Sequence, residues 1–323
     1  MEGPVCRVGW TYSKAGVDVS AQKAMEEQFI KKSKKLANGI GGYASSFNVC
    51  GEVTLHVDGV GTKTELLRKY SRNWVAGWDC LMVNANDVAC EGFRVFAYVD
   101  YLAVERGDPV LAREVAEGMS KAAEALGAVL AGGETAIMPD VVKGYDVSCT
   151  VLGVREARPQ PPRPGDAVIA VASNGPHANG YTLIRRLIQA GLLDPEPLLD
   201  FLLAPVANYH NPLLRAMKEG KAKWGAHVTG GAFYKVHSRL PKGLGVRLEA
   251  WEVPEGFVKI VEAAGMSAEE AYKTFNMGVG MLVVGSEEAV EAFEREGLKA
   301  WKAGEVVEGP TEIETPWGKV VIR

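Results

Sequence analysis

The sequence lacks three features that would place it in other classes of protein. No apolar run approaches the roughly 18 residues that a membrane-spanning helix needs. Residues 1–14 lack the apolar core of a signal peptide. The 36 basic and 40 acidic side chains give a net charge of −4, without the positive excess typical of nucleic-acid-binding proteins. We therefore expect a cytoplasmic protein with neither a membrane partner nor a nucleic-acid partner.

Cysteine is also scarce, and its spacing fits neither a disulfide framework nor a zinc site. The chain has five cysteines, which is an odd number, and it contains no CxxC motif. Most of them lie in apolar stretches, as small buried side chains do. We therefore expect reduced, buried thiols at Cys6, Cys50, Cys80, Cys90 and Cys149.

A proline-rich segment divides the chain into two halves. Residues 155–166 read REARPQPPRPGD, a composition typical of an exposed, semi-rigid connection. The total of 323 residues is ample for two domains. We predict a first domain at 1–155, a linker at 155–166 and a second domain at 166–323.

Hydrophobic periodicity predicts that strands and helices alternate in both halves. The best-marked helix begins after Asp108, which is followed by Pro109, and ends at Gly127. In the first half we also expect strands at 52–58, 94–103, 128–132 and 145–154 and a buried helix at 73–91. In the second half we expect strands at 167–172, 225–229, 244–249, 278–285, 301–307 and 319–323, with helices at about 179–190, 205–219, 254–274 and 287–296. This alternation is typical of an α/β fold.

The first candidate site lies where the expected strand 52–58 ends, in the sequence VDGVGTK. Asp58 offers an oxygen ligand of the kind that magnesium prefers, and the glycines let a ligand approach the backbone. Thr62 and Lys63 follow, and lysine is a point charge suited to phosphate. The spacing differs from that of a P-loop. A polar hairpin turn is the alternative interpretation.

Further acidic residues point to the same chemistry. Asp79, Asn86 and Asp87 share one face of the expected helix 73–91, among apolar neighbours; the alternative is that this face lies in solvent. Asp100 interrupts an apolar strand, either near the other carboxylates or on the wet face of an edge strand. Gly132 and Gly133 lie at the end of the strand expected at 128–132, and Glu134 and Thr135 follow them. Carboxylates at several strand ends would converge on a magnesium site that also holds substrate phosphates.

Glycine-rich segments in the second half are suited to anions. Residues 173–181 follow a strand and open a helix, and they contain His177 and Asn179. Thr229, Gly230 and Gly231 repeat this pattern, while Asn276 lies in a tight turn. His227 precedes its loop, so we expect it to be structural. Taken alone, the residues indicate phosphoryl transfer from a nucleotide to a phosphorylated acceptor.

Together the motifs resemble the phosphoribosylformylglycinamidine cyclo-ligase family of purine biosynthesis, also called aminoimidazole ribonucleotide synthetase. The resemblance extends over nearly the whole chain. The motifs that carry it, in order, are YSKAGVD (12–18), NGIGGYAS (38–45), VDGVGTK (57–63), GWDCLMVNANDV (77–88), VDYLA (99–103), GGETAIMP (132–139), YDVSCTVLGV (145–154), GPHANGY (175–181), LLAPVANY (202–209), AHVTGG (226–231), TFNMGVGM (274–281) and AWKAGEV (300–306).

The resemblance implies an α/β (α+β) fold of two domains and an ATP-dependent ligase. Such an enzyme converts formylglycinamidine ribonucleotide and ATP to 5-aminoimidazole ribonucleotide, ADP and phosphate, with Mg²⁺. The formyl oxygen is phosphorylated, and a nitrogen of the substrate then closes the imidazole ring. The resemblance also implies a homodimer whose N-terminal sheets pair into a barrel, and a C-terminal α/β sandwich that binds the substrate.

The resemblance assigns roles to the candidate residues. Asp58, Asp87, Asp100 and Glu134 would bind the metal. The nucleotide would be contacted by Gly41, Gly42, Thr62, Asp79, Asn86, Asp100, Gly132, Gly133, Glu134 and Thr135. The catalytic residues would be Asp58, Lys63, Asp87 and His177, and the substrate would be bound by Asn179, Thr229, Gly230, Gly231 and Asn276.

Two segments depart from the family pattern and affect the expected contacts to the substrate phosphate. Phe93, Arg94 and Val95 replace the usual Ala-Glu-Pro, and Ala232 replaces a third glycine. Two alternatives remain. One is a relative that uses ATP on another acceptor, such as a formylglycinamidine ribonucleotide synthase subunit or a thiamine phosphate kinase. The other is a nucleotide-binding partner without catalysis.

Overall fold

A computed structural model describes residues 24–25, 27–28, 31 and 52–323 of the chain. Gly41, Gly42, Cys6 and Cys50 lie outside these residues, so their predictions stay untested. Among the described residues, no helix combines the length and the apolar character needed to cross a membrane.

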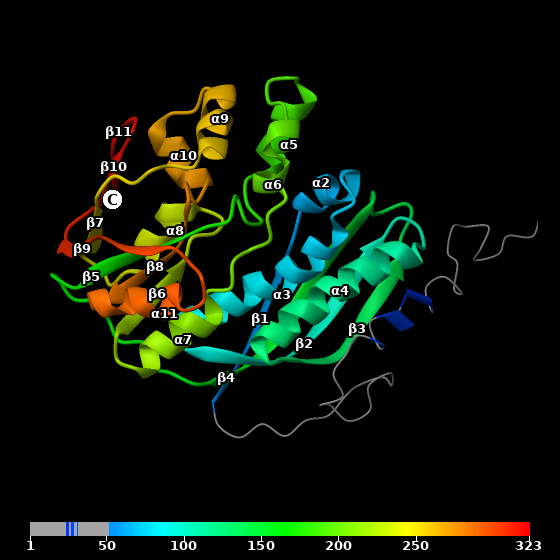
Figure 1. Cartoon of the computed structure of the whole chain (residues 1–323), viewed down its shortest axis with the longest axis horizontal. Coiled ribbons are helices and arrows are strands. Elements are labelled where there is room, and N and C mark those ends of the chain that lie inside the picture. Colours follow the sequence, from blue (N-terminus) through cyan, green and yellow to red (C-terminus); the bar gives the residue numbers. More distant parts are fainter. Residues whose placement is uncertain (1–23, 26, 29–30, 32–51) are drawn as a thin grey trace, which may run out of the picture.

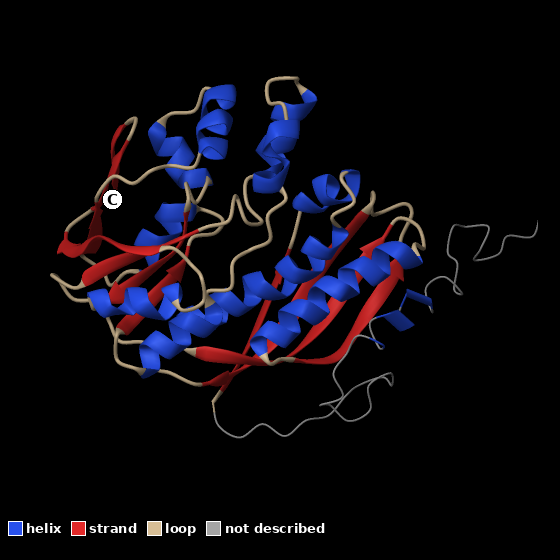
Figure 2. Ribbon diagram, viewed as in Figure 1, coloured by secondary structure: helices blue, strands red, loops and turns tan. Residues whose placement is uncertain are grey.

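The first half forms a four-stranded sheet covered on one face by helices (Figures 1 and 2). The sheet order is β1-β4-β2-β3, and only β2 and β3 run parallel. The elements are β1 (Val53–Gly59), α2 (Lys63–Lys69), α3 (Asn73–Cys90), β2 (Phe93–Val104), α4 (Pro109–Leu126), β3 (Val129–Ile137) and β4 (Tyr145–Arg155).

Residues 156–166 contain neither helix nor strand and lead to a seven-stranded sheet. Its strand order is β11-β10-β7-β9-β5-β8-β6. Its elements are β5 (Ala167–Ala172), α5 (Tyr181–Gln189), α6 (Leu199–Leu202), α7 (His210–Lys218), β6 (Ala222–His227), α8 (Ala232–Arg239), β7 (Leu244–Leu248), α9 (Glu255–Ala264), α10 (Ala268–Thr274), β8 (Val279–Gly285), α11 (Val290–Glu294), β9 (Ala300–Glu308), β10 (Thr311–Thr315) and β11 (Gly318–Ile322), with short 3₁₀ turns at Glu196–Leu198 and Glu287–Ala289.

Helices cover both faces of this second sheet because its central strands are apolar on both sides. Every residue of β8 is buried. Val283 packs in the same cluster as α7 and α11, whereas its neighbour Val284 packs in the cluster that contains α8, α9 and α10. The second half is therefore a layered α/β structure, as expected. The described residues contain two open sheets and no closed barrel.

The expected helix after Asp108 is confirmed, and its packing depends on glycine. Asp108 accepts hydrogen bonds from the N–H groups of Val110 and Leu111, and Gly127 ends α4 with φ +66°. A Cβ atom on Gly118 would lie 1.8 Å from the Trp74 carbonyl oxygen of α3, and one on Gly77 would lie 1.9 Å from that of Val115. The two helices therefore contact each other backbone to backbone.

Two expectations for the first half are wrong. The strand predicted at 128–132 continues to Ile137, so Gly132, Gly133, Glu134 and Thr135 lie inside β3 rather than at or beyond its end. Pairing with β2 from Ala97 to Val104, with one register shift between Tyr98 and Val99, extends the strand. The second error concerns the cysteines, because Cys80 of α3 and Cys149 of β4 form a disulfide.

The disulfide escaped prediction because its two cysteines are 69 residues apart in sequence. Their Cα atoms lie 5.6 Å apart where α3 crosses the sheet, a separation that a disulfide spans readily. Cys90 is the free cysteine among the described residues, and it is buried as expected. Burial, together with the nearby negative charge of Asp87, raises the pKa of its thiol to about 12.

The segment 204–209 of the second half is fastened to α3 of the first. The Trp78 indole donates a hydrogen bond to the Val206 carbonyl at 2.7 Å, and the Asn86 side chain bonds both the Ala207 carbonyl and the Tyr209 N–H. These residues follow one face of α3. The helix thus forms the junction between the halves (Figure 1).

His210 adds another contact across the junction, and it predicts a pH dependence of stability. Its Nε2 accepts a hydrogen bond from the Val95 N–H of β2 at 3.0 Å. Burial lowers the pKa of His210 from 6.5 to about 4. Between these values the unfolded chain binds a proton at His210 and the folded chain does not. The free energy of unfolding should therefore fall as the pH decreases through this window, by up to roughly 3 kcal/mol.

Urea unfolding at a series of pH values tests this expectation. We expect the slope between about pH 6.5 and pH 4 to be smaller in His210→Gln than in the wild type. His237→Gln is the control, because that imidazole is only half-buried. Equal slopes in His210→Gln and the wild type would show that His210 does not carry the effect.

Candidate functional site

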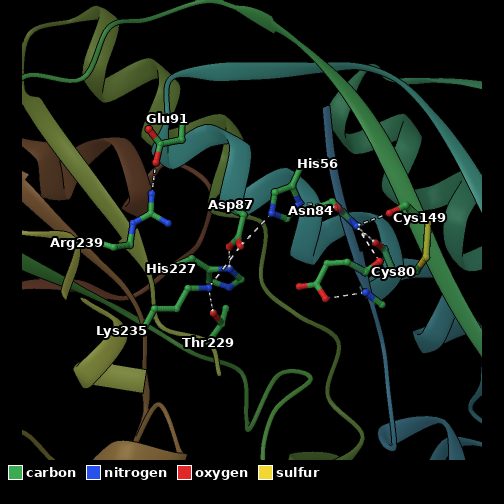
Figure 3. Close-up of polar contacts among 12 residues, drawn as sticks. His56, Cys80, Asn84, Asp87, Glu91, Cys149, His227, Thr229, Lys235 and Arg239 are labelled. Carbon is green, nitrogen blue, oxygen red and sulfur yellow. Dashed lines mark hydrogen bonds and ion pairs between the residues drawn. A yellow bond between two sulfur atoms is a disulfide. The ribbon is translucent and has the colours of Figure 1, made fainter. Parts of the chain in front are cut away.

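Asp87 lies at the centre of a polar cluster at the junction between the two halves (Figure 3). Its carboxylate oxygen Oδ1 lies 2.8 Å from Nδ1 of His227 at the end of β6. Its other oxygen, Oδ2, lies 3.6 Å from Nε2 of His56 on β1 and 3.8 Å from Nζ of Lys235 on α8. We call these four residues the Asp87 cluster.

The charges of the Asp87 cluster favour the ionised carboxylate. Burial opposes ionisation, but the hydrogen bond from His227 and the positive charges of His227, Lys235 and His56 outweigh it. The pKa of Asp87 is therefore below its usual value. A carboxylate of this kind, at the meeting point of two domains, can bind a cation or orient an imidazole.

Asn84 connects the Asp87 cluster to the first sheet (Figure 3). Its side-chain oxygen lies 2.8 Å from Nδ1 of His56. Its side-chain N–H₂ group lies within hydrogen-bonding distance of the carbonyl groups of Asp58, Cys80 and Cys149. A single buried amide therefore fixes α3 against β1 and β4, beside the disulfide.

Lys63 and Asp79, both predicted to contact nucleotide phosphates, form a completely buried ion pair at 2.6 Å. Lys63 also donates a hydrogen bond to the Ala204 carbonyl, and Asp79 accepts one from the Val206 N–H. Burial lowers the pKa of Lys63 and raises that of Asp79, while their mutual attraction opposes both shifts. In this structure the pair fastens 204–206 to the first half, and the Lys63 ammonium is not exposed to a phosphate.

Asn86 is also used by the fold. Its amide is occupied by the Ala207 carbonyl and the Tyr209 N–H, as described above. The stripe of Asp79, Asn86 and Asp87 on one face of α3 is thus confirmed as a buried stripe. Asp87 is the member whose carboxylate meets the side chains of the second half.

The predicted metal ligands do not gather into one site. Asp58 and Asp100 both stand opposite Cys149 in the sheet, on the face that α3 covers. Glu134 is exposed and stands opposite Tyr101, which is also exposed. Among the described residues, no group of three or more His, Cys, Asp or Glu side chains has an arrangement suited to a metal ion.

Asp100 is the most perturbed of the predicted ligands. Burial raises its pKa to about 7, and the negative charge of Glu134 adds to this increase. A hydrogen bond from the backbone of Asp100 to its own carboxyl group opposes the increase. A Cβ atom on Gly133 would lie 2.3 Å from its carboxyl oxygen, so the glycine provides the space for the carboxyl group. Of the neighbouring candidates, Gly132 and Thr135 lie in β3, with Thr135 buried.

Thr62 stands at the start of α2, where its hydroxyl lies 3.2 Å from that of Thr182 on α5. The VDGVGTK segment therefore reaches the second half at this point. It is a strand end followed by a helix, not a hairpin turn.

His177 is buried in the second half and adopts the left-handed backbone conformation, with φ +59°. Its Nε2 lies 3.3 Å from the Tyr209 hydroxyl, and its Nδ1 has no partner among the described residues. Burial lowers its pKa well below the usual value, and the positive charges of His227 and Lys63 lower it further. A left-handed, non-glycine residue with a free buried nitrogen is typical of a functional site.

The loop after β6 brings the remaining candidates toward the Asp87 cluster. The Thr229 hydroxyl accepts a hydrogen bond from Lys235 at 3.1 Å (Figure 3). A Cβ atom on Gly230 would lie 3.1 Å from the Asn179 side-chain oxygen, so the two predicted anion loops adjoin. Gly231, which has φ +81°, is the N-cap residue of α8.

Asn276, Arg94 and the residues that follow Gly231 make contacts within the fold. Asn276 bonds Ser173, Gly175 and Gly278. Ala232, at the position of a usual glycine, has φ +42°. Arg239 pairs with Glu91 at the end of α3, and Arg94 pairs with Glu156 at 2.9 Å.

Sequence reasoning missed three residues of the site: His56, Lys235 and Tyr209. It also assigned a structural role to His227, whose imidazole bonds Asp87. The only available signal for His56 was its position two residues before Asp58 on the same strand face. Tyr209 is the last residue of the motif LLAPVANY, but the motif gave it no role, and Lys235 lies in none of the motifs.

Comparisons with known proteins agree with this fold. Residues 34–155 match the N-terminal domain of AIR synthase related proteins, and residues 163–315 match their C-terminal domain. Solved structures with the same fold include the hydrogenase maturation protein HypE of E. coli, with a TM-score of 0.68 and 15% identity over 94% of this chain and 96% of that one. Thiamine-monophosphate kinase of Stenotrophomonas maltophilia has a TM-score of 0.64 and 16% identity over 91% and 96%.

Curated relatives are more similar in sequence. A phosphoribosylformylglycinamidine cyclo-ligase of Saccharolobus solfataricus is 38% identical over 87% of both chains. One of Methanothermobacter thermautotrophicus is 33% identical over 94% of this chain and 96% of its own length. The chain therefore belongs to the phosphoribosylformylglycinamidine cyclo-ligase family.

Proposed function

We propose that this protein closes the imidazole ring of 5-aminoimidazole ribonucleotide in de novo purine biosynthesis, in the cytoplasm. It converts formylglycinamidine ribonucleotide and ATP to the aminoimidazole ribonucleotide, ADP and phosphate. The observation that carries this proposal is the 38% identity with a curated cyclo-ligase over 87% of both chains. The buried disulfide is compatible with this compartment, because both sulfur atoms lie out of reach of cytosolic thiols.

The junction between residues 1–155 and residues 166–323, which we propose as the two domains, is the reaction site. ATP enters as its magnesium complex on the side of Asp58, Thr62 and Asp87, and the substrate binds near His177 and Thr229. The four predicted metal ligands do not gather into one site among the described residues, so we assign the Mg²⁺ of the reaction to no set of these side chains. Lys235 supplies positive charge where phosphate is transferred.

A panel of acceptors tests the reaction assignment. Purified protein is given ATP, Mg²⁺ and one acceptor at a time, and ADP release is followed. We expect ADP release with formylglycinamidine ribonucleotide. We expect no ADP release above background with thiamine monophosphate, or with formylglycinamide ribonucleotide plus an ammonia source. Preferred turnover of either of the other acceptors would replace the cyclo-ligase assignment by that of a relative.

We propose that the protein is a homodimer formed through the open face of the first sheet. The face opposite α3 exposes an apolar set of side chains, and nothing in the described residues covers it. Its members are Val53, Leu55, Val57, Val99 and Tyr101, with exposed fractions between 40% and 72%. Apolar strands of this kind become buried when two sheets meet, and two such sheets could complete a barrel.

Sedimentation velocity at micromolar concentration tests this prediction. The wild type should sediment as a dimer, and Leu55→Lys/Val57→Lys should sediment as a folded monomer because lysine on this face opposes burial. Val141→Lys is the control, since that side chain is 80% exposed in the turn after β3. A monomeric wild type would refute the shared sheet interface.

A further inference from the structure

His177, His227 and Tyr209 form a buried aromatic cluster where the two halves meet. The ring centres of His177 lie 5.7 Å from His227 and 5.8 Å from Tyr209. The three residues are almost completely buried, and Nδ1 of His177 has no hydrogen-bond partner among the described residues. A buried nitrogen without a partner is rare enough to require an explanation.

The hydrogen bonds of Tyr209 determine which nitrogen of His177 carries the proton. The Tyr209 hydroxyl lies 2.7 Å from the Ala172 carbonyl oxygen, which can only accept, so the hydroxyl proton is donated there. The same hydroxyl oxygen lies 3.3 Å from Nε2 of His177. That contact therefore needs a proton from the imidazole. His177 is held as the Nε2–H tautomer, and its Nδ1 keeps a free lone pair.

Tyr209 also connects this histidine to the first half of the chain. Its backbone N–H donates to the side-chain oxygen of Asn86 on α3 at 2.9 Å. The backbone of Tyr209 is thus fixed to the helix that carries Asp87, while its side chain fixes His177. Tyr209 therefore contacts both the predicted nucleotide side and the predicted substrate side.

We propose that Tyr209 is a positioning residue for the ring-closing reaction, which holds His177 as the Nε2–H tautomer so that Nδ1 accepts a hydrogen bond from an N–H group of the substrate. This inference rests on the proposed function. The amidine of the substrate is rich in N–H groups, whereas its ribose phosphate has none.

Gly280 on β8 keeps the space that this arrangement needs. A Cβ atom at this position would lie 1.9 Å from the Tyr209 hydroxyl oxygen and 2.6 Å from Cε1 of His177. Gly280 does not have a positive φ, so its backbone conformation would accept alanine. The obstacle to alanine is the steric clash with the Tyr209 and His177 side chains. Gly280→Ala therefore disturbs the same contact from the opposite side.

The first experiment reads the tautomer directly, without turnover. Long-range ¹H–¹⁵N correlation spectra of the full-length protein resolve the imidazole nitrogens, and the five histidines are assigned with single His→Gln variants. We expect Nε2–H for His177 in the wild type, and a mixture of tautomers in Tyr209→Phe. We expect no change in Tyr272→Phe, which removes a buried hydroxyl that has no hydrogen-bond partner within the described part of the chain. An Nδ1–H tautomer in the wild type, or an unchanged one in Tyr209→Phe, overturns the proposal.

The second experiment measures kinetics and substrate contact. We expect Tyr209→Phe to lower kcat about 10- to 100-fold with KM changed less than about 3-fold, as when other partners that orient a histidine are removed. Gly280→Ala should act in the same direction, and Tyr272→Phe should stay within about 2-fold. Saturation with formylglycinamidine ribonucleotide should move the ¹⁵N resonance of Nδ1. A resonance that stays in place, or a loss confined to KM, overturns the role in positioning.

These readouts separate the two proposals. If the wild type releases no ADP with formylglycinamidine ribonucleotide, the proposed function fails, whatever the tautomer. If the wild type turns over normally and Tyr209→Phe does so too, the function stands and the role of Tyr209 fails.

Discussion

Replacing Lys63 by methionine is expected to lower the free energy of unfolding by about 3–5 kcal/mol, because it leaves the Asp79 carboxylate buried without its cation. Methionine fills a similar volume, so lost packing contributes little. The Ala204 carbonyl also loses a donor, which loosens the segment that joins the halves. Chemical denaturation of the purified variant measures the effect.

A double variant distinguishes a structural ion pair from a phosphate-binding lysine. Lys63→Met/Asp79→Leu removes both charges and should recover a large part of the stability, because replacing a buried pair by apolar side chains is often neutral. Lys121→Met is the matched control, since that side chain is exposed on α4. If Lys63→Met is as stable as the wild type but has lost ATP binding, Lys63 contacts the nucleotide and the structural assignment is wrong.

Removing the disulfide is expected to have an effect of similar size. Cys80→Ala/Cys149→Ala should be less stable than the wild type by roughly 4 kcal/mol, the value that chain entropy predicts for a loop closed over 69 residues. The bond also lies beside Asn84, which fixes α3 and His56. We therefore expect lower ATP affinity in addition to lower stability.

Peptide mapping without reduction and urea unfolding test this prediction together. The mapping should find the peptides that contain Cys80 and Cys149 linked. Cys90→Ala, which removes a buried free thiol from the same helix, should cost less than the double variant. Unlinked peptides in the native protein would show that the original expectation of reduced thiols was correct.

Local sequence patterns predicted most elements of the fold because they depend on local physics. The cap at Asp108 and the stop at Gly127 mark α4 by their own side-chain and backbone preferences. The strand at 167–172 is found at the predicted residues because it is apolar throughout. The end of β3 was missed because pairing with β2, a long-range interaction, extends the strand through two glycines that predict a turn.

The sequence predicted which types of residue form the site better than it predicted how they are arranged. Asp87 was found because a carboxylate among apolar neighbours on a helix needs a partner. Its actual partners, His56, His227 and Lys235, come from three elements spread along the chain, so no spacing connects them. The structure does not bring the predicted carboxylates together, because β-strand alternation turns Glu134 to the face opposite that of Asp100. The sequence shows that strand residues alternate between two faces, but it does not show which of the two faces the helices cover.

This chain couples the conversion of one ATP to ADP and phosphate to the closure of one imidazole ring. The most direct test mixes the purified protein with Mg²⁺, ATP and formylglycinamidine ribonucleotide, and measures ADP and the diazotisable aminoimidazole in the same sample over time. We predict that both products appear at the same rate and in equal amounts. ATP binding with neither product, or ADP release without the aminoimidazole, would contradict the claim.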